Sequence, residues 1–238
     1  MIFSAGLGTR LYPYTIANPK ALVEINKKTF LEIAIRKFIK IGVKDIIVNV
    51  HHFPDQIIQL LKDKQNFGIN ISISDERDQL LDTGGGIKRA SWFFNDGEPF
   101  FVHNVDVLTD INLEQMWNFH HDNKALATLA VRNRETSRYL LFDSSNILCG
   151  WENIKTAEKI LARASEKLRR LAFSGVHIID PLIFNSMNET GMFSIIKAYL
   201  RLATENRIVG FEHDESSWLD IGTPEKLEEA KKNYLFLT

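Results

Sequence analysis

The feature that most constrains the fold of this chain is a regular alternation of short apolar runs with segments of helical periodicity. Residues 45–50 and 100–105 are mostly apolar and rich in β-branched or aromatic side chains, as is typical of strands buried on both faces. Apolar residues recur at helical spacing over residues 30–41 and 54–64. Strand–helix–strand units of this length predict an α/β fold, a Rossmann-like mostly parallel mixed sheet sandwiched by helices.

Weaker patterns extend this prediction to both ends of the chain. Ile2–Phe3 indicates a first strand, which is either unusually short or lacks a few preceding residues. Further strands are expected at residues 70–74, 125–131, 138–142, 147–151, 172–179, 209–211 and 218–221. Further helices are expected at residues 86–94 and 113–122, from Asp180-Pro181, and from Thr223-Pro224 to about Tyr234. Residues 155–170 are ambiguous, although their apolar residues would suit a helix. No repeat or linker is visible, so a single domain is expected.

Composition excludes several classes of protein. Among 238 residues, 29 Lys and Arg balance 30 Asp and Glu, for a net charge of −1. Proteins that coat nucleic acid or an anionic membrane favour a basic surplus, so neither is expected as a partner. Cys149 is the only cysteine, which rules out an intramolecular disulfide and favours a reducing, cytoplasmic location. No apolar run approaches the roughly 18 residues of a membrane span.

Ligands of such sheets bind beyond the carboxyl ends of the strands. The segment after the first predicted strand contains Gly6-Leu7-Gly8-Thr9-Arg10-Leu11. It is not the dinucleotide fingerprint, which needs a third glycine where Leu11 stands and a helix where Pro13 stands. Bare glycine amides nevertheless allow close approach of a polyphosphate. Arginine offers a planar fork for phosphate oxygens and lysine a mobile point charge.

Residues 5–15, together with Asn18-Pro19-Lys20-Ala21-Leu22, closely resemble the signature of the sugar-1-phosphate nucleotidylyltransferases. The resemblance covers most of the chain and implies the nucleotide-diphospho-sugar transferase fold. It implies a nucleotide-binding half over residues 1–112 and a sugar-phosphate-binding half over residues 113–238. It also implies that the phosphates of a nucleoside triphosphate lie against Ala5, Gly6, Gly8 and Thr9, with Arg10 and Lys20 as catalytic cations.

Two acidic motifs match the same family. Asn104-Val105-Asp106 resembles its strand-end acidic site, with Val105 in place of a small residue, and residues 218–224 resemble its late Trp-x-Asp-x-Gly-Thr-Pro motif. The resemblance implies that Asp106 and Asp220 are catalytic and hold Mg²⁺. Two carboxylates suit a hard cation that takes its other ligands from water and phosphate.

The remaining matches concern the base and the sugar. Residues 80–87 resemble the family's base-recognition loop, where Leu80, Thr83 and Gly84 would face the base. The alternative is a glycine-rich helix cap. On the sugar side, the resemblance implies roles for Asn104, Glu152, Asn153 and Gly175, although a strand glycine can equally mark a bulge. The Glu-Lys-Pro of many relatives is absent, because residues 151–155 read Trp-Glu-Asn-Ile-Lys. The identity of the sugar therefore stays open.

The activity expected from the resemblance is the Mg²⁺-dependent joining of a nucleoside triphosphate and a sugar 1-phosphate, with release of pyrophosphate. UTP is the preferred donor, because Asp82-Thr83-Gly84-Gly85 most resembles the loop of the uridylyltransferases. The alternatives are a guanylyltransferase for mannose or heptose 1-phosphate, a cytidylyltransferase for phosphocholine, and a nucleotide-sugar-binding regulator without turnover. The product would be a precursor of cell wall or polysaccharide, and the enzyme a monomer or homo-oligomer.

Overall fold

The computed structural model describes residues 1–233 of the chain, so Tyr234, the expected end of the last helix, lies outside the described residues. The chain forms two compact units. The first comprises residues 1–81, 103–110 and the described part of 217–238, and the second comprises residues 82–102 and 111–216. Each unit is assembled from separate stretches of chain, so no single cut in the sequence separates them, which agrees with the expected single domain.

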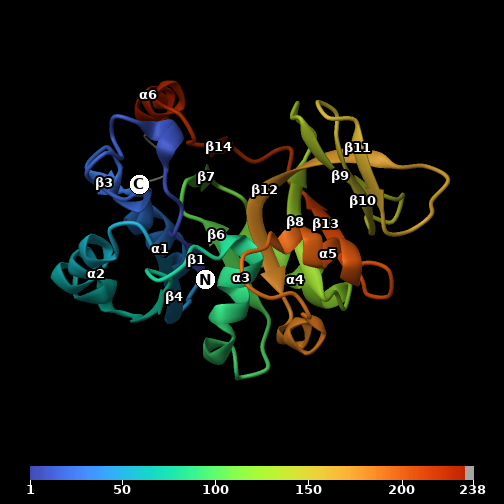
Figure 1. Cartoon of the computed structure of the whole chain (residues 1–238), viewed down its shortest axis with the longest axis horizontal. Coiled ribbons are helices and arrows are strands. Elements are labelled where there is room, and N and C mark those ends of the chain that lie inside the picture. The colour runs from blue at the N-terminus through green and yellow to red at the C-terminus, as the bar shows by residue number, and fades with distance from the viewer. Residues whose placement is uncertain (234–238) are drawn as a thin grey trace. The chain divides into compact units, whose positions relative to one another are not determined.

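Parallel strands form the centre of the first unit (Figure 1). The two-residue strand β1 (Ile2–Phe3) pairs in parallel with β4 (Asp45–Val50) and with the end of β6 (Phe100–Asn104), and β4 pairs in parallel with β5 (Asn70–Asp75). The predicted first strand at Ile2–Phe3 is therefore confirmed. Two antiparallel ribbons complete the strands of this unit: β2 (Glu24–Ile25) with β3 (Lys28–Thr29), and β7 (Val107–Thr109) with β14 (Trp218–Asp220).

The α-helices of the first unit begin where the sequence predicts them. In α1 (Phe30–Lys40), the Thr29 hydroxyl accepts a hydrogen bond from the Glu32 amide at 3.1 Å, which is one of the two hydrogen bonds of a helix capping box. The Glu32 carboxylate instead accepts from the Arg36 side chain at 2.8 Å. The other helices are α2 (Pro54–Asp63), α6 (Pro224–Asn233) and the short 3-10 helices η1 (Thr9–Leu11), η2 (Lys20–Leu22) and η3 (Gln65–Gly68).

The second unit is mainly antiparallel. The long strand β12 (Arg169–Ile179) pairs with β8 and β9, β10 lies between β9 and β11, and β13 pairs in parallel with β8. The bounds are β8 (Ala127–Arg132), β9 (Arg138–Phe142), β10 (Leu148–Asn153), β11 (Glu158–Leu161) and β13 (Ile208–Glu212). The helices are α3 (Asp82–Arg89), α4 (Leu113–Asp122), α5 (Ile195–Leu202), η4 (Ser91–Phe93) and η5 (Pro181–Ser186). Helix α4 packs on β8 and β12.

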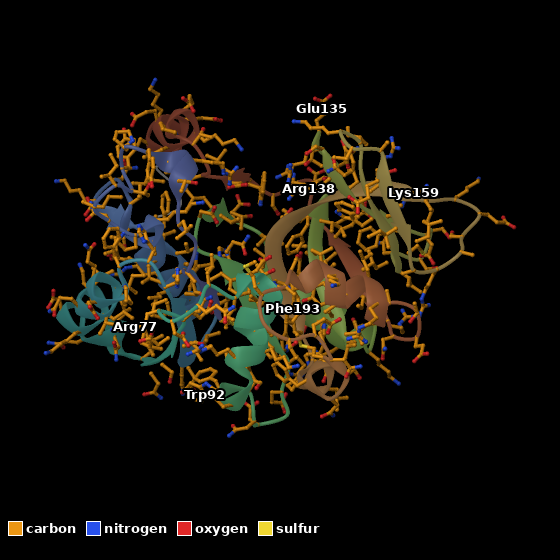
Figure 2. All side chains as sticks on the ribbon, viewed as in Figure 1. Arg77, Trp92, Glu135, Arg138, Lys159 and Phe193 are labelled. Atoms are coloured by element: carbon orange, nitrogen blue, oxygen red, sulfur yellow. The ribbon has the colours of Figure 1, made fainter. Side chains whose placement is uncertain are left out.

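The structure resolves one ambiguous segment and changes the start of one expected helix. Residues 155–170 form no helix: they contain the edge strand β11, an irregular segment and the start of β12. All four residues of β11 are exposed, and Figure 2 shows Lys159 on this strand, so cross-strand hydrogen bonds rather than burial of an apolar face determine its conformation. Helix α3 begins at Asp82, before the expected residue 86, because its consecutive glycines are buried and close packing offsets their low helix propensity.

No helix among the described residues is long and apolar enough to cross a membrane.

Candidate active site

The β7–β14 ribbon of the first unit brings two carboxylates from distant parts of the sequence together. Asp220 is the last residue of β14 and lies opposite Val107, the first residue of β7. Asp106 immediately precedes β7, and its carbonyl oxygen accepts a hydrogen bond from the Ile221 amide at 2.9 Å. The backbone pairing therefore fixes the two aspartates beside each other, as the sequence predicts for a shared site.

Two cations from the segment that follows β1 lie near these carboxylates. Lys20, the first residue of η2, donates through Nζ to Asp106 Oδ2 in an ion pair that is largely removed from solvent. The guanidinium of Arg10, in η1, lies over the backbone of Gly222. A Cβ atom at Gly222 would stand only 3.0–3.1 Å from three guanidinium atoms. The structure thus brings Arg10, Lys20, Asp106 and Asp220 into one cluster, which we call the charged cluster.

Asp220 is the member of the charged cluster whose carboxylate is incompletely satisfied. Burial and the neighbouring charge of Asp106 raise the pKa of Asp220, whereas Lys20, Lys226 and Arg10 act in the opposite direction. Asp220 Oδ1 is buried and has no hydrogen-bond partner among the described residues. An orphaned carboxylate oxygen beside a second carboxylate is the environment that a divalent cation stabilises, and Mg²⁺ often uses only one or two protein carboxylates. The residues present therefore fit Mg²⁺.

No group of three or more potential His, Cys, Asp or Glu ligands for a metal occurs among residues 1–233. The sequence contains two pairs of adjacent histidines, His51-His52 and His120-His121, and one member of each pair has a partner within the protein. His51 Nδ1 contacts the Glu76 carbonyl oxygen at 2.7 Å, and His120 Nδ1 contacts the Thr128 hydroxyl at 2.9 Å. A metal at Asp106 and Asp220 would therefore need its remaining ligands from water or substrate.

In the glycine loop that follows β1 (residues 6–11), a side chain would find free space at Gly6 but not at Gly8. A Cβ atom at Gly6 would meet no atom within 4 Å, whereas one at Gly8 would lie 3.0 Å from Thr15 Cγ2 and 3.1 Å from Lys20 Cβ. Gly8 also adopts a φ of +66°, which disfavours other residues. The buried Thr15 hydroxyl donates to the Gly8 carbonyl at 2.8 Å. The loop is thus closed around Gly8 and leaves room at Gly6; Ala5 is buried and Thr9 begins η1.

The proposed base-loop residues have structural partners in the second unit. The Thr83 hydroxyl accepts from the Ile195 amide at 3.0 Å, and the Gly84 amide donates to the Phe193 carbonyl at 2.8 Å. A Cβ atom at Gly84 would collide with the Phe193 ring, which Figure 2 shows beside α3 and α5. Gly84, Gly85 and Gly86 therefore lie at the start of helix α3. Gly84 is needed there because a side chain at this position would clash with Phe193. A role of Thr83, Gly84 and the half-buried Leu80 in base recognition stays a prediction.

The proposed sugar-side residues are dispersed, and part of their polar capacity is already used. The buried Glu152 carboxylate pairs with Arg170, and Asn153 Oδ1 accepts from the Lys155 amide at 3.0 Å. Gly175 has a φ of +76° within β12, where the register with β8 shifts between Phe173 and His177. This glycine therefore lies in a β-bulge, the alternative considered from the sequence. Asn104 ends β6 and is half-buried.

Sequence reasoning missed a pair of buried polar residues at the strand ends of the first unit. Asn49 lies in β4, whose other buried residues are apolar, and Glu76 directly follows β5; their side chains form a hydrogen bond of 2.8 Å. Asn49 Oδ1 also accepts from the Ser4 amide at 2.7 Å, just before the glycine loop. An asparagine in an apolar strand run was the available signal, because buried polar groups need partners.

Comparison with known proteins shows what the chain is similar to. The family model described as "Nucleotidyl transferase" matches residues 1–236. The chain is 32% identical over 235 residues to the N-acetylmuramate alpha-1-phosphate uridylyltransferase of Caulobacter vibrioides, covering 94% of this chain and 92% of that protein. It is 29% identical over 227 residues to the mannose-1-phosphate guanyltransferase of Yarrowia lipolytica, covering 94% of this chain but 60% of that protein.

Solved structures agree on the fold. The UDP-glucose pyrophosphorylase of Acinetobacter baumanii superposes with a TM-score of 0.78 at 17% sequence identity, covering 98% of this chain and 91% of that one. At this identity the likeness concerns the fold alone. It confirms the predicted mixed α/β architecture, which is the nucleotide-diphospho-sugar transferase fold.

Proposed function

The chain belongs to the nucleotidyl transferase family and is a sugar-1-phosphate nucleotidyltransferase; on that premise we propose that it transfers UMP from UTP to a sugar 1-phosphate with the help of Mg²⁺. The observation that carries the mechanism is the charged cluster, in which Lys20 and Arg10 face Asp106 and Asp220. Such a cluster can bind a polyphosphate and a divalent cation together.

In the proposed reaction, an ionised phosphate oxygen of the sugar 1-phosphate attacks the α-phosphorus of the triphosphate. The bond between the α-phosphorus and the oxygen bridging to the β-phosphorus breaks, and pyrophosphate leaves with the electron pair. No protein nucleophile or general base is required, because the attacking oxygen is already ionised. Catalysis then consists of alignment and stabilisation of charge.

Each residue of the charged cluster has a distinct role in this proposal. Arg10, exposed beside Gly222, binds phosphate oxygens with its planar fork. Lys20 releases Asp106 and instead stabilises the negative charge that develops on the leaving pyrophosphate. Asp106 and Asp220 would hold Mg²⁺, which would supply positive charge to stabilise the reacting phosphates.

The open position at Gly6 supports the placement of the triphosphate. Its missing side chain leaves space next to the backbone, whereas Gly8 is fully occupied by its neighbours. Free amide groups at such a loop can approach phosphate oxygens closely. The glycine loop and the charged cluster belong to the same unit.

The choice of UTP rests on the longer match. The chain covers nearly the whole length of the Caulobacter uridylyltransferase and only 60% of the Yarrowia guanyltransferase. The loop Asp82-Thr83-Gly84-Gly85 favours the same donor. The second candidate is GTP, which the match to the guanyltransferase favours.

A pyrophosphate-release assay tests the proposal. The protein is incubated with Mg²⁺, each of the four nucleoside triphosphates, and a panel of N-acetylmuramate, mannose, heptose and glucose 1-phosphates together with phosphocholine. Release with UTP and one sugar 1-phosphate supports the proposal. Release only with GTP or CTP would transfer the assignment to the guanylyl or cytidylyl alternative, and no release with any pair would favour a binding protein without turnover.

A further inference from the structure

Four residues of the first unit form a continuous hydrogen-bonded path between two segments that flank the nucleotide site. The Ser4 amide donates to Asn49 Oδ1 at 2.7 Å, Asn49 Nδ2 donates to Glu76 Oε1 at 2.8 Å, and the Leu81 amide donates to Glu76 Oε2 at 3.3 Å. We call the side chains of Asn49 and Glu76 the Asn49–Glu76 bridge. It joins the residue before the glycine loop to the end of the Leu80–Leu81 segment.

The bridge is protected from solvent. Asn49 is 2% exposed and Glu76 is 0% exposed, and Ser4 and Leu81 are also buried. Hydrogen bonds in such surroundings are strong, and an unpaired member is costly. A buried carboxylate is among the more expensive groups to place inside a protein. Its presence here therefore calls for a reason beyond filling space.

The backbone of Glu76 is fixed as firmly as its side chain. Its amide donates to the Val50 carbonyl at 2.7 Å, and its carbonyl accepts from the Gln79 amide at 3.0 Å. His51 Nδ1 contacts the same carbonyl oxygen at 2.7 Å. These contacts hold the ends of β4 and β5, and the turn that follows β5, together at Glu76. The carboxylate itself is aimed at the two segments that would carry the nucleotide.

We propose that Asn49 and Glu76 are positioning residues for the nucleotide: they hold the glycine loop and the Leu80–Leu81 segment in one fixed arrangement before the triphosphate binds. This inference rests on the proposed function. Preorganisation of this kind lowers the ordering cost of binding. The bridge makes no contact with the charged cluster among the hydrogen bonds described above, so it governs nucleotide affinity rather than the chemical step.

The polarity of the bridge allows a reciprocal exchange as its test. In Asn49→Asp the new carboxylate faces Glu76 with no hydrogen between them. In Glu76→Gln, when the new side-chain oxygen accepts from Leu81, the new amide group faces Asn49 Nδ2, so two donors oppose each other. In the double variant, the aspartate introduced at position 49 accepts from the Ser4 amide and from the side-chain amide of the glutamine introduced at position 76. The oxygen of that glutamine accepts from the Leu81 amide, so all three hydrogen bonds and the net charge are restored.

The expected result is a KM effect. Each single variant should raise KM for the triphosphate by about tenfold or more, as expected for loss of a buried hydrogen bond to a charged group, with kcat within about threefold of wild type. The double variant should return KM to within about threefold of wild type. Ser74→Ala is the matched control, because the buried Ser74 hydroxyl has no hydrogen-bond partner among the described residues. It should leave KM unchanged.

The outcomes separate this inference from the proposed function. A wild-type protein that releases no pyrophosphate with any substrate pair overturns the proposed function. With an active wild type, single variants that lower Tm but keep KM show a merely structural bridge and overturn the inference alone. A double variant that does not fold, or that folds with the KM of the single variants, overturns it as well, because that variant retains every hydrogen bond of the bridge. Restoration of KM in the double variant supports it.

Discussion

Lys20 and Asp106 form an ion pair whose side chains are only 12% and 16% exposed, and Asp106 lies beside the orphaned carboxylate of Asp220. Lys20 pairs with Asp106, whereas Lys20, Lys226 and Arg10 act on Asp220 through their charge. The residues that we propose for catalysis and metal binding therefore also affect stability.

Asp220→Asn should separate activity from stability. We expect kcat to fall about 10²–10³-fold, as for removal of one preorganised electrostatic group, with a much smaller loss of nucleotide affinity. Tm at neutral pH should rise, because the raised pKa of Asp220 means that its ionised form opposes folding. For an acid with a raised pKa, that cost grows as the pH rises above the unfolded pKa. Wild-type kcat in this variant at saturating Mg²⁺ would contradict the assignment.

Lys20→Met should change the response of the protein to divalent cations. Without the ammonium group, Asp106 and Asp220 lose their nearest positive charge, so Tm should fall in metal-free buffer. Added Mg²⁺ should then raise Tm by more than in wild type, because the cation replaces the missing charge. Differential scanning fluorimetry over a MgCl₂ series measures both effects. Asp106→Asn combined with Lys20→Met is the control, and it should lose the extra stabilisation.

Gly6→Ala and Gly8→Ala form a matched pair. Gly6→Ala should keep Tm, because its Cβ meets open space, but should raise KM for the triphosphate by filling the space that we assign to phosphate. Gly8→Ala should destabilise the fold by about 1–2 kcal/mol, since its φ is +66° and its Cβ would press on Thr15 and Lys20. Chemical denaturation and steady-state kinetics distinguish the two. An unchanged KM in Gly6→Ala would show that the triphosphate does not bind against this loop.

His103 should contribute to acid denaturation. Burial, followed by the charge of Lys37, lowers the pKa of His103 to about 3, compared with an ordinary value of 6.5. Between these pH values the unfolded chain binds a proton that the folded protein excludes. Stability is therefore full above pH 6.5 and is lost as the pH falls toward 3, with a slope of at most about 1.4 kcal/mol per pH unit.

His103→Phe should flatten that slope, because phenylalanine can retain the edge contact with Phe38 and carries no titratable group. His52→Gln is the control on a half-buried histidine that follows β4, and it should retain the wild-type slope. Denaturation midpoints measured from pH 4 to 7 provide the comparison. Equal slopes for wild type and His103→Phe would show that another group governs acid stability.

The elements that were predicted well are those whose signal is local. The helix over residues 30–41 and the strand at residues 45–50 follow from the helical spacing of apolar residues and from a β-branched run, and both are found where expected. Residues 155–170 stayed ambiguous in the sequence, because the strand in this segment, β11, depends on pairing with β10 rather than on a local pattern. The early start of α3 was missed, because three consecutive glycines disfavour a helix unless close packing requires them.

For the active site, sequence alone determined the kinds of groups present: a glycine loop, two cations and two acidic residues in motifs that resemble one family. It also determined where each lies relative to a strand. Only the tertiary structure decided that Lys20 pairs with Asp106, that Arg10 covers Gly222, and that the Asn49–Glu76 bridge joins two loops. Motifs are local in the chain, whereas ion pairs and buried hydrogen bonds depend on which distant backbone segments the strand pairing places side by side.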